Sequence, residues 1–270
     1  MLNFIIKRRL QICFMKEISS LCFFFLIGFG LIGFGLIGFG LIGFGLIGFG
    51  LIGFGLGHRM LNLENISLGF ESDTPLVSAL SLSVPAGEMG LIQGPSGVGK
   101  STLLSIIAGV DIKAVQWTGR ITLNGQDISH LPPQKRQVGL MFQDPLLFPH
   151  LTVAQNLAFG LSHTYHGQER HERITSALQA CDMAGFEDRD PASLSGGQKA
   201  RIGLMRCMLA EPQLLLMDES FSALDPDLRK RFGRFVADQI TKRNIPALLV
   251  SHHDSDAELA DGPILVLKPS

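Results

Sequence analysis

A glycine-rich segment between an apolar run and a helical pattern restricts the fold of this chain more than any other feature. Residues 94–102 read Gly-Pro-Ser-Gly-Val-Gly-Lys-Ser-Thr, a complete phosphate-binding loop. The apolar residues in 87–93 favour a strand, and the apolar spacing from Thr102 to Ala108 favours a helix. A strand, a glycine-rich loop and a helix in this order predict a nucleotide site in an α/β domain.

This loop has the chemistry that a triphosphate requires. Its glycines let backbone N–H groups converge beside a helix N-terminus, Lys100 adds a full positive charge, and the hydroxyl of Ser101 is expected to ligate Mg²⁺. The predicted phosphate-binding residues are Gly94, Pro95, Ser96, Gly97, Val98, Gly99, Lys100, Ser101 and Thr102. Because kinases, GTPases and motor ATPases all contain such a loop, other motifs must decide the class.

Two continuous apolar runs, 214–217 and 247–250, have the length expected for strands buried on both faces. Further strands are expected at 61–70, 80–84, 121–123, 138–143 and 264–267. Their alternation with helices predicts a mainly parallel α/β core that binds phosphates at the carboxyl ends of its strands.

Polar residues follow several of these strands. Asp218 is expected to hold Mg²⁺ through water, and Glu219 beside it is the candidate general base that orients the attacking water. Gln143 and His252 also stand at strand ends, within reach of water, Mg²⁺ or a γ-phosphate. An ordinary acidic turn is the alternative for Asp218 and Glu219, and the phosphate loop in the same chain favours the catalytic interpretation.

Helical spacing from 153 to 181 predicts a helical lobe, which Asp190-Pro191 interrupts. The segment 194–198 then reads Leu-Ser-Gly-Gly-Gln, and helical spacing resumes at Ile202, Met205 and Leu209. A flexible Ser-Gly-Gly linker is therefore not favoured at this position.

The phosphate loop and this second motif together resemble the ATP-binding cassette (ABC) ATPases, over essentially the whole of 60–270. The resemblance implies that Gln143 belongs to the Q-loop, where it also ligates Mg²⁺, that Asp225 belongs to the D-loop, and that His252 is the switch histidine. Phe70 matches the aromatic residue that stacks on adenine, with a strand-end core position as the alternative. Ser220 departs from the family, which usually has proline after the catalytic glutamate.

The same resemblance implies that Ser195, Gly196, Gly197 and Gln198 bind the γ-phosphate of an ATP held by another cassette, so that two ATP molecules join a homodimer. The fold class predicted is α/β: a P-loop NTPase core with a mainly parallel sheet, an antiparallel β subdomain and a helical signature subdomain at about 144–210. Expected cofactors are ATP and Mg²⁺.

The segment 144–161 resembles the part of prokaryotic importer ATPases that meets a helix of the membrane permease. An apolar patch buried within the helical lobe is the alternative, and Leu146, Leu147 and Phe148 are expected to divide between both roles. The leading hypothesis is the ATPase subunit of a small-solute importer, similar to small cassettes of thiamine-type or uncharacterised uptake systems. Its expected partners are permease subunits and a separate solute-binding protein.

Other functions fit the sequence less well. A soluble ABC ATPase in cofactor assembly or another non-transport process remains the alternative. The short separation of Gln143 from Leu194 excludes the long coiled coil of chromosome-type cassettes. A kinase or GTPase would leave 194–198 and His252 unexplained. A net charge of −1 gives no electrostatic reason to bind nucleic acid.

The four cysteines have no Cys-x-x-Cys spacing, so neither a zinc site nor a disulfide framework is suggested. A reducing compartment fits this pattern. The expected location is cytoplasmic, peripheral on the inner face of the cell membrane.

Residues 26–55 contain the pentapeptide Leu-Ile-Gly-Phe-Gly six times. Successive copies are rotated by about 140° on a helix and fall on opposite faces of a strand, so neither structure gains an apolar face. This uncharged segment is long enough to span a membrane. However, the basic residues before it would stay on the inner side, so the ATPase domain after it would lie outside the cell; these residues are Lys7, Arg8, Arg9 and Lys16. We therefore expect 1–59 to be a low-complexity extension, spurious or disordered, with Met60 as the working start and 60–270 as the ABC ATPase domain.

Overall fold

The computed structural model describes residues 59–70, 75–112 and 114–268. The repeats of 26–55, for which a low-complexity extension is predicted, lie outside these residues. No helix in the described part of the chain is long and apolar enough to cross a membrane.

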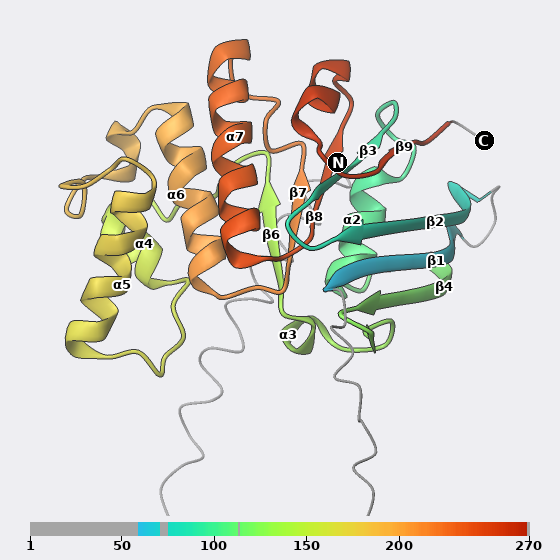
Figure 1. The fold of residues 1–270 in the computed structure, drawn as a ribbon, viewed down its shortest axis with the longest axis horizontal. Helices are drawn as coiled ribbons and strands as arrows, with labels where there is room; N and C mark the ends of the chain where they lie inside the picture. Colours follow the sequence, from blue (N-terminus) through green and yellow to red (C-terminus); the bar gives the residue numbers. More distant parts are fainter. Residues whose placement is uncertain (1–58, 71–74, 113, 269–270) are drawn as a thin grey trace, which may run out of the picture. The chain divides into compact units, whose positions relative to one another are not determined.

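A parallel sheet forms the centre of the domain (Figure 1). Its strand order is β6-β7-β8-β3-β9, and all neighbouring pairs are parallel. The strands are β3 (Met89–Gln93), β6 (Val138–Phe142), β7 (Leu214–Asp218), β8 (Ala247–Ser251) and β9 (Ile264–Val266). The predicted parallel core is confirmed, and the carboxyl ends of its strands meet at one edge of the sheet.

Both faces of this sheet are covered, which explains the continuous apolar runs in β7 and β8. Leu214 and Leu216 belong to one buried cluster with residues of helix α2 (Lys100–Ala108). Leu215 and Met217 belong to another with residues of α6 (Gly196–Leu209) and α7 (Pro226–Arg243). Alternate residues of a strand point to opposite faces, so each face needs its own apolar set.

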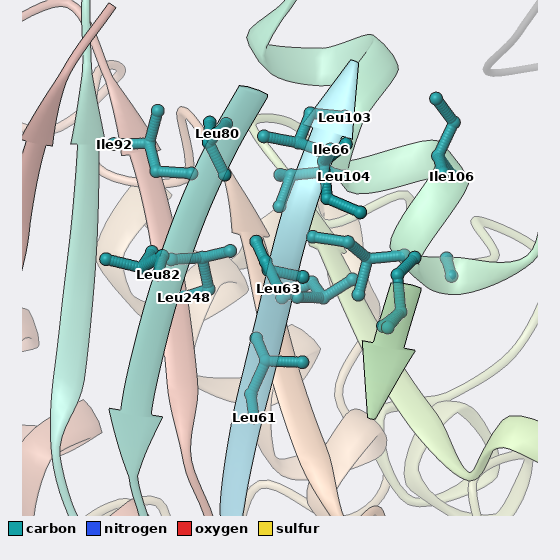
Figure 2. Close-up of a cluster of buried hydrophobic side chains, with 14 of the residues drawn as sticks. Leu61, Leu63, Ile66, Leu80, Leu82, Ile92, Leu103, Leu104, Ile106 and Leu248 are labelled. Carbon is teal, nitrogen blue, oxygen red and sulfur yellow. The ribbon is translucent and has the colours of Figure 1, made fainter. Parts of the chain in front are cut away.

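An antiparallel sheet with strand order β2-β1-β4-β5 packs on the other side of α2. It contains β1 (Met60–Phe70), β2 (Val77–Pro85), β4 (Val115–Leu123) and β5 (Gln126–Asp127). Figure 2 shows Ile66 of β1 beside Leu103 and Leu104 of α2, with Leu63 and Leu61 of the same buried cluster farther along the strand. This sheet matches the predicted antiparallel subdomain, and it fixes α2 from the side opposite the parallel sheet.

The expected strands at 80–84 and 121–123 are longer in the structure, because antiparallel partners extend them into less apolar sequence. The turn predicted near Asn124-Gly125 joins β4 to β5. Both residues have positive φ, at 54° and 81°, as a tight two-residue hairpin requires. The turn-rich stretch after it contains a short helix, α3 (Pro133–Arg136).

The predicted helical lobe contains α4 (Val153–Ala158), α5 (Gly167–Ala180) and α6, and its own buried cluster includes Val153, Leu178 and Ile202. The helical pattern of 153–181 is divided into two helices. At Gly160 a Cβ would lie 2.1 Å from the Arg206 carbonyl oxygen, so the chain passes close to α6 where α4 ends. Two 3-10 helices, Pro191–Ser193 and Asp254–Leu259 (η3), complete the described elements.

Candidate functional site

The phosphate loop joins β3 to α2 in the predicted order. Gly97 and Gly99 have φ of 88° and 99°, a region that residues with a side chain rarely adopt. Lys100 is only 4% exposed, and its Nζ donates to the carbonyl oxygens of Gly94 and Pro95 at 2.7 and 2.9 Å. These two bonds hold the ammonium group of Lys100 against the first residues of the phosphate loop.

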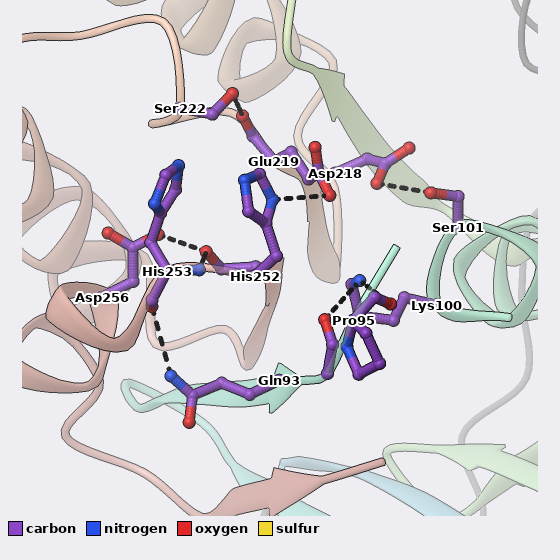
Figure 3. A network of polar contacts seen from close by, with 12 residues as sticks. Gln93, Pro95, Lys100, Ser101, Asp218, Glu219, Ser222, His252, His253 and Asp256 are labelled. Atoms are coloured by element: carbon purple, nitrogen blue, oxygen red, sulfur yellow. Dashed lines mark hydrogen bonds and ion pairs between the residues drawn. The ribbon is translucent and has the colours of Figure 1, made fainter. Parts of the chain in front are cut away.

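The predicted Mg²⁺ ligands Ser101 and Asp218 are side by side, because the Ser101 hydroxyl donates to Asp218 Oδ1 at 2.8 Å (Figure 3). One hydroxyl and one carboxylate suit Mg²⁺, which takes few protein ligands and completes its shell with water and phosphate oxygens. Within the described residues, no group of three or more His, Cys, Asp or Glu side chains is arranged to hold a metal by itself. The donor set therefore fits a cation that arrives with a nucleotide.

Burial lowers the pKa of Lys100 from its ordinary value, and the negative charges of Glu219 and Asp218 oppose this shift. These carboxylates favour the ammonium form. The two carboxylates also balance the positive charge of Lys100, as the phosphates of a bound nucleotide would.

The candidate general base Glu219 pairs with the candidate switch residue His252, with Oε1 and Nδ1 3.0 Å apart. Both side chains are partly exposed, and they lie together because β7 and β8 are neighbours (Figure 3). The backbone N–H of Glu219 donates to the Val250 carbonyl at 2.9 Å. Its φ of 50° is unusual for a residue with a side chain, so the neighbouring contacts hold a strained backbone in place.

Gln143 follows β6 and is exposed. In the register of the parallel sheet Phe142 pairs with Asp218, which places Gln143 at the same edge as Glu219. The structure thus assembles Lys100, Ser101, Asp218, Glu219 and His252 in one region and puts Gln143 at the adjacent strand end.

Ser220 takes the position where the family usually has proline. Its side chain is 2% exposed, and its hydroxyl donates to the Met141 carbonyl at 3.0 Å. This bond ties the loop after Glu219 to the strand that ends before Gln143.

The signature residues form the start of α6. Ser195 and Gln198 make a reciprocal capping box: Ser195 Oγ accepts from Gln198 N at 3.3 Å, and Gln198 Oε1 accepts from Ser195 N at 2.9 Å. Ser195 and Gly196 are exposed, and a Cβ on Gly196 would meet no atom within 4 Å. A helix N-terminus with free space in front of it is suited to an anion.

Asp225 caps α7, because its Oδ1 accepts from Leu228 N at 2.9 Å. Leu228 also packs against the signature helix, and a Cβ on Gly197 would lie 2.7 Å from its side chain. The segments that match the signature and the D-loop are therefore in contact through one leucine.

Phe70 is half-buried at the end of β1, opposite Val115 of β4. Residues 71–74, which follow it, are outside the described part. A strand-end core position and an adenine-stacking position both fit this environment, so its role remains a prediction.

The segment expected to meet a permease is half-buried at Leu146, Leu147 and Phe148. The ring centroids of Phe148 and Phe159 are 4.7 Å apart. The guanidinium carbon of Arg206 lies 5.5 Å from the Phe148 ring centroid. Arg206 of α6 also donates to the Leu146 carbonyl at 3.1 Å. The segment is thus anchored to the lobe and still presents apolar surface.

A further polar residue, not predicted from the sequence, supports the loop that carries His252. Gln93, the last residue of β3, donates from Nε2 to the His253 carbonyl at 3.2 Å. The one signal in the sequence is a polar residue at the end of an apolar strand. Its partner is far along the chain, so the contact depends on β3 and β8 being neighbours.

Comparison with known proteins gives consistent relatives. Residues 77–222 match the family model described as ABC transporter. The uncharacterised ABC transporter ATP-binding protein YnjD of Escherichia coli (strain K12) is 40% identical over 206 residues, which cover 76% of this chain and 94% of that protein. The sulfate/thiosulfate import ATP-binding protein CysA of the same strain is 38% identical over 212 residues, which cover 76% of this chain and 57% of CysA. This chain therefore spans little more than half the length of CysA.

A solved structure shares the architecture. cbiO1 from Clostridium perfringens, part of the ABC transporter complex cbiONQ, superposes with a TM-score of 0.70 at 26% sequence identity. The match covers 78% of this chain and 85% of that chain.

Proposed function

This chain belongs to the ABC transporter family as an ATP-binding subunit, and from that membership we propose that it hydrolyses ATP to drive solute uptake through a separate membrane permease. One observation carries the proposal. The Ser101–Asp218 and Glu219–His252 pairs stand at neighbouring strand ends beside Lys100.

Each of these residues has a chemical task in the proposed reaction. Lys100 and the N–H groups at the start of α2 bind the phosphates and neutralise their charge. Ser101, Asp218 and Gln143 would hold Mg²⁺, which supplies positive charge at the β- and γ-phosphates. Glu219 orients the attacking water and accepts its proton, while His252 holds the glutamate side chain in place.

The hydrolytic site is completed by a second copy of the chain in this proposal. Ser195, Gly196, Gly197 and Gln198 of one copy bind the γ-phosphate of ATP held by the other. The free space in front of Gly196 supports this role. ATP then joins two copies, and hydrolysis releases them.

We further propose that the ATPase lies peripherally on the inner face of the membrane, bound to its permease through the segment around Phe148. A separate solute-binding protein delivers the solute. CysA is named for sulfate and thiosulfate import, and that specificity is not carried over, because the permease and the binding protein select the solute.

The test measures Mg²⁺-dependent ATP hydrolysis by the full chain alone and together with candidate membrane permease subunits from the same organism. Slow hydrolysis that rises with the permease supports the transport function. Hydrolysis that no membrane partner changes favours a soluble role, such as cofactor assembly. A chain that binds ATP without hydrolysing it in either setting contradicts the proposal.

A further inference from the structure

A buried charged pair lies behind His252. Arg229 is in the first turn of α7 and Asp256 is in η3, and their side chains are 13% and 2% exposed. Their nearest charged atoms, one terminal nitrogen of Arg229 and Oδ1 of Asp256, are 3.7 Å apart, beyond hydrogen-bond distance. Arg229 Nε and Asp256 Oδ1 are the buried side-chain polar atoms of the described residues that make no hydrogen bond.

Asp256 fixes the chain on both sides of His252 (Figure 3). Its Oδ2 accepts from the Ser251 hydroxyl at 2.5 Å, and that hydroxyl accepts from His253 N at 3.0 Å. The His253 carbonyl in turn accepts from Gln93. The backbone that carries His252 is therefore held by a buried carboxylate.

Arg229 contacts the segment that runs from Glu219 to Asp225. Its guanidinium lies 3.5 and 3.4 Å from the carbonyl oxygens of Ser222 and Leu224, and donates to Ser255 Oγ at 3.1 Å. Ser222 itself donates from its hydroxyl to the Glu219 carbonyl at 2.7 Å. Arg229 thus connects the backbone of the Glu219 loop with the backbone of the His252 loop.

We propose that Arg229 and Asp256 are positioning residues for ATP hydrolysis, which hold His252 against Glu219 and link that contact to the segment ending at Asp225. The proposal rests on the proposed function. A buried charge that loses its partner is strongly unfavourable, so neither loop moves independently while the pair is intact.

The test compares Asp256→Asn and Arg229→Met in the full chain. We expect kcat for ATP hydrolysis to fall by about 10- to 100-fold while KM for ATP stays within about twofold, because the phosphate loop is untouched. The matched controls are Lys230→Met and Glu258→Gln. Their exposed pair, 3.3 Å apart, joins the same two elements, and we expect these variants to retain wild-type kcat.

A second measurement separates positioning from loss of stability. If Asp256 acts through His252, Asp256→Asn should add no further loss of kcat to a His252→Ala variant. Asp256→Glu keeps the carboxylate and should recover part of the activity. If Asp256→Asn does not fold, Arg229→Lys and Ser255→Ala are measured in the same cycle.

Unchanged kcat in Asp256→Asn, or losses that simply add to those of His252→Ala, would overturn the inference. The hydrolytic part of the proposed function would still stand if the wild-type chain hydrolyses ATP. It would fail instead if the wild-type chain shows no hydrolysis.

Discussion

Glu219 combines a strained backbone with a side chain whose position depends on neighbours. Its φ of 50° persists because its N–H is bonded to Val250 and its carbonyl accepts from Ser222. Such strain is common where a side chain must point in one direction for function. In this chain it directs the carboxylate towards His252.

Replacing this carboxylate should separate binding from hydrolysis. In Glu219→Gln the shape is preserved but the proton acceptor is lost, so we expect ATP hydrolysis to fall by at least about 100-fold. The affinity for ATP should stay close to that of the wild type, because Lys100 and the loop N–H groups are unchanged. Nucleotide binding by calorimetry and phosphate release measure the two effects, and Glu64→Gln on the exposed surface is the control. Equal loss of both would argue against a base at this position.

Helix α2 is fixed at both ends. Its N-terminus carries the phosphate loop, and its last turn is bonded by the buried guanidinium of Arg136, which donates to the carbonyls of Ile106 and Ile107 at 2.8 and 3.0 Å. The same guanidinium donates to Leu131 and Ser129 at 2.7 and 2.8 Å. The bond to Ile107 supplies a donor to a carbonyl of the last helical turn, and the bond to Ile106 adds a second donor to a carbonyl that also accepts from Gly109 N at 3.0 Å.

Removing this cap should destabilise the whole domain. We expect Arg136→Met to lower the free energy of unfolding by about 3 kcal/mol, because several buried carbonyl groups lose their donor together. The neighbouring Lys135→Met is exposed and should change it by less than about 0.5 kcal/mol. Urea unfolding of both variants provides the measurement. Equal free energies of unfolding would show that Arg136 does not stabilise the domain in this way.

Replacing the Phe148 side chain tests whether the segment around it binds a permease. Because this ring is half-buried and packs on Phe159, we expect Phe148→Ala to weaken permease attachment by at least about 1 kcal/mol while ATP binding is retained. Co-purification with the permease and nucleotide titration measure the two effects. Phe186→Ala, also half-buried in the lobe, is the matched control. If ATP binding and attachment fell together, core damage would explain the result.

The predictability of these elements differs for a physical reason. The phosphate loop, β7 and β8 were predictable because glycine spacing and apolar runs are local properties of the sequence. The Arg136 cap and the Arg229–Asp256 pair were not, because their partners are distant in sequence and meet only after the sheets are assembled. The division between α4 and α5 was also missed, since it depends on the close approach of Gly160 to α6.

The domain of the described residues has a simple layered plan in which α2 lies between two sheets and α6 and α7 cover the far face. The parallel sheet brings catalytic candidates from distant parts of the sequence to one edge. The helical lobe presents the signature on a separate surface. The fold class was predictable from alternating strands and helices. In the proposed function, the signature residues of the lobe complete the sheet-edge site of a second copy, which one chain does not contain.

This division of the site predicts a nucleotide-dependent dimer. We expect the Glu219→Gln chain to be monomeric without nucleotide and dimeric with ATP, because ATP that is not hydrolysed keeps both halves of the site joined. In Gly196→Asp/Glu219→Gln, the added carboxylate enters free space, and an acidic residue in the first turn of α6 does not destabilise the helix. It repels a γ-phosphate, so this variant should bind ATP and remain monomeric.

Light scattering coupled to gel filtration measures the mass in each condition. The control is Ala192→Asp in the same Glu219→Gln background, which adds the same charge at a nearby exposed position and should still dimerise. Dimerisation of the Gly196→Asp variant to the same extent as this control would contradict a signature that closes the partner's site. A Glu219→Gln chain that stays monomeric at saturating ATP would contradict the ATP-joined dimer itself, because then no second copy completes the site.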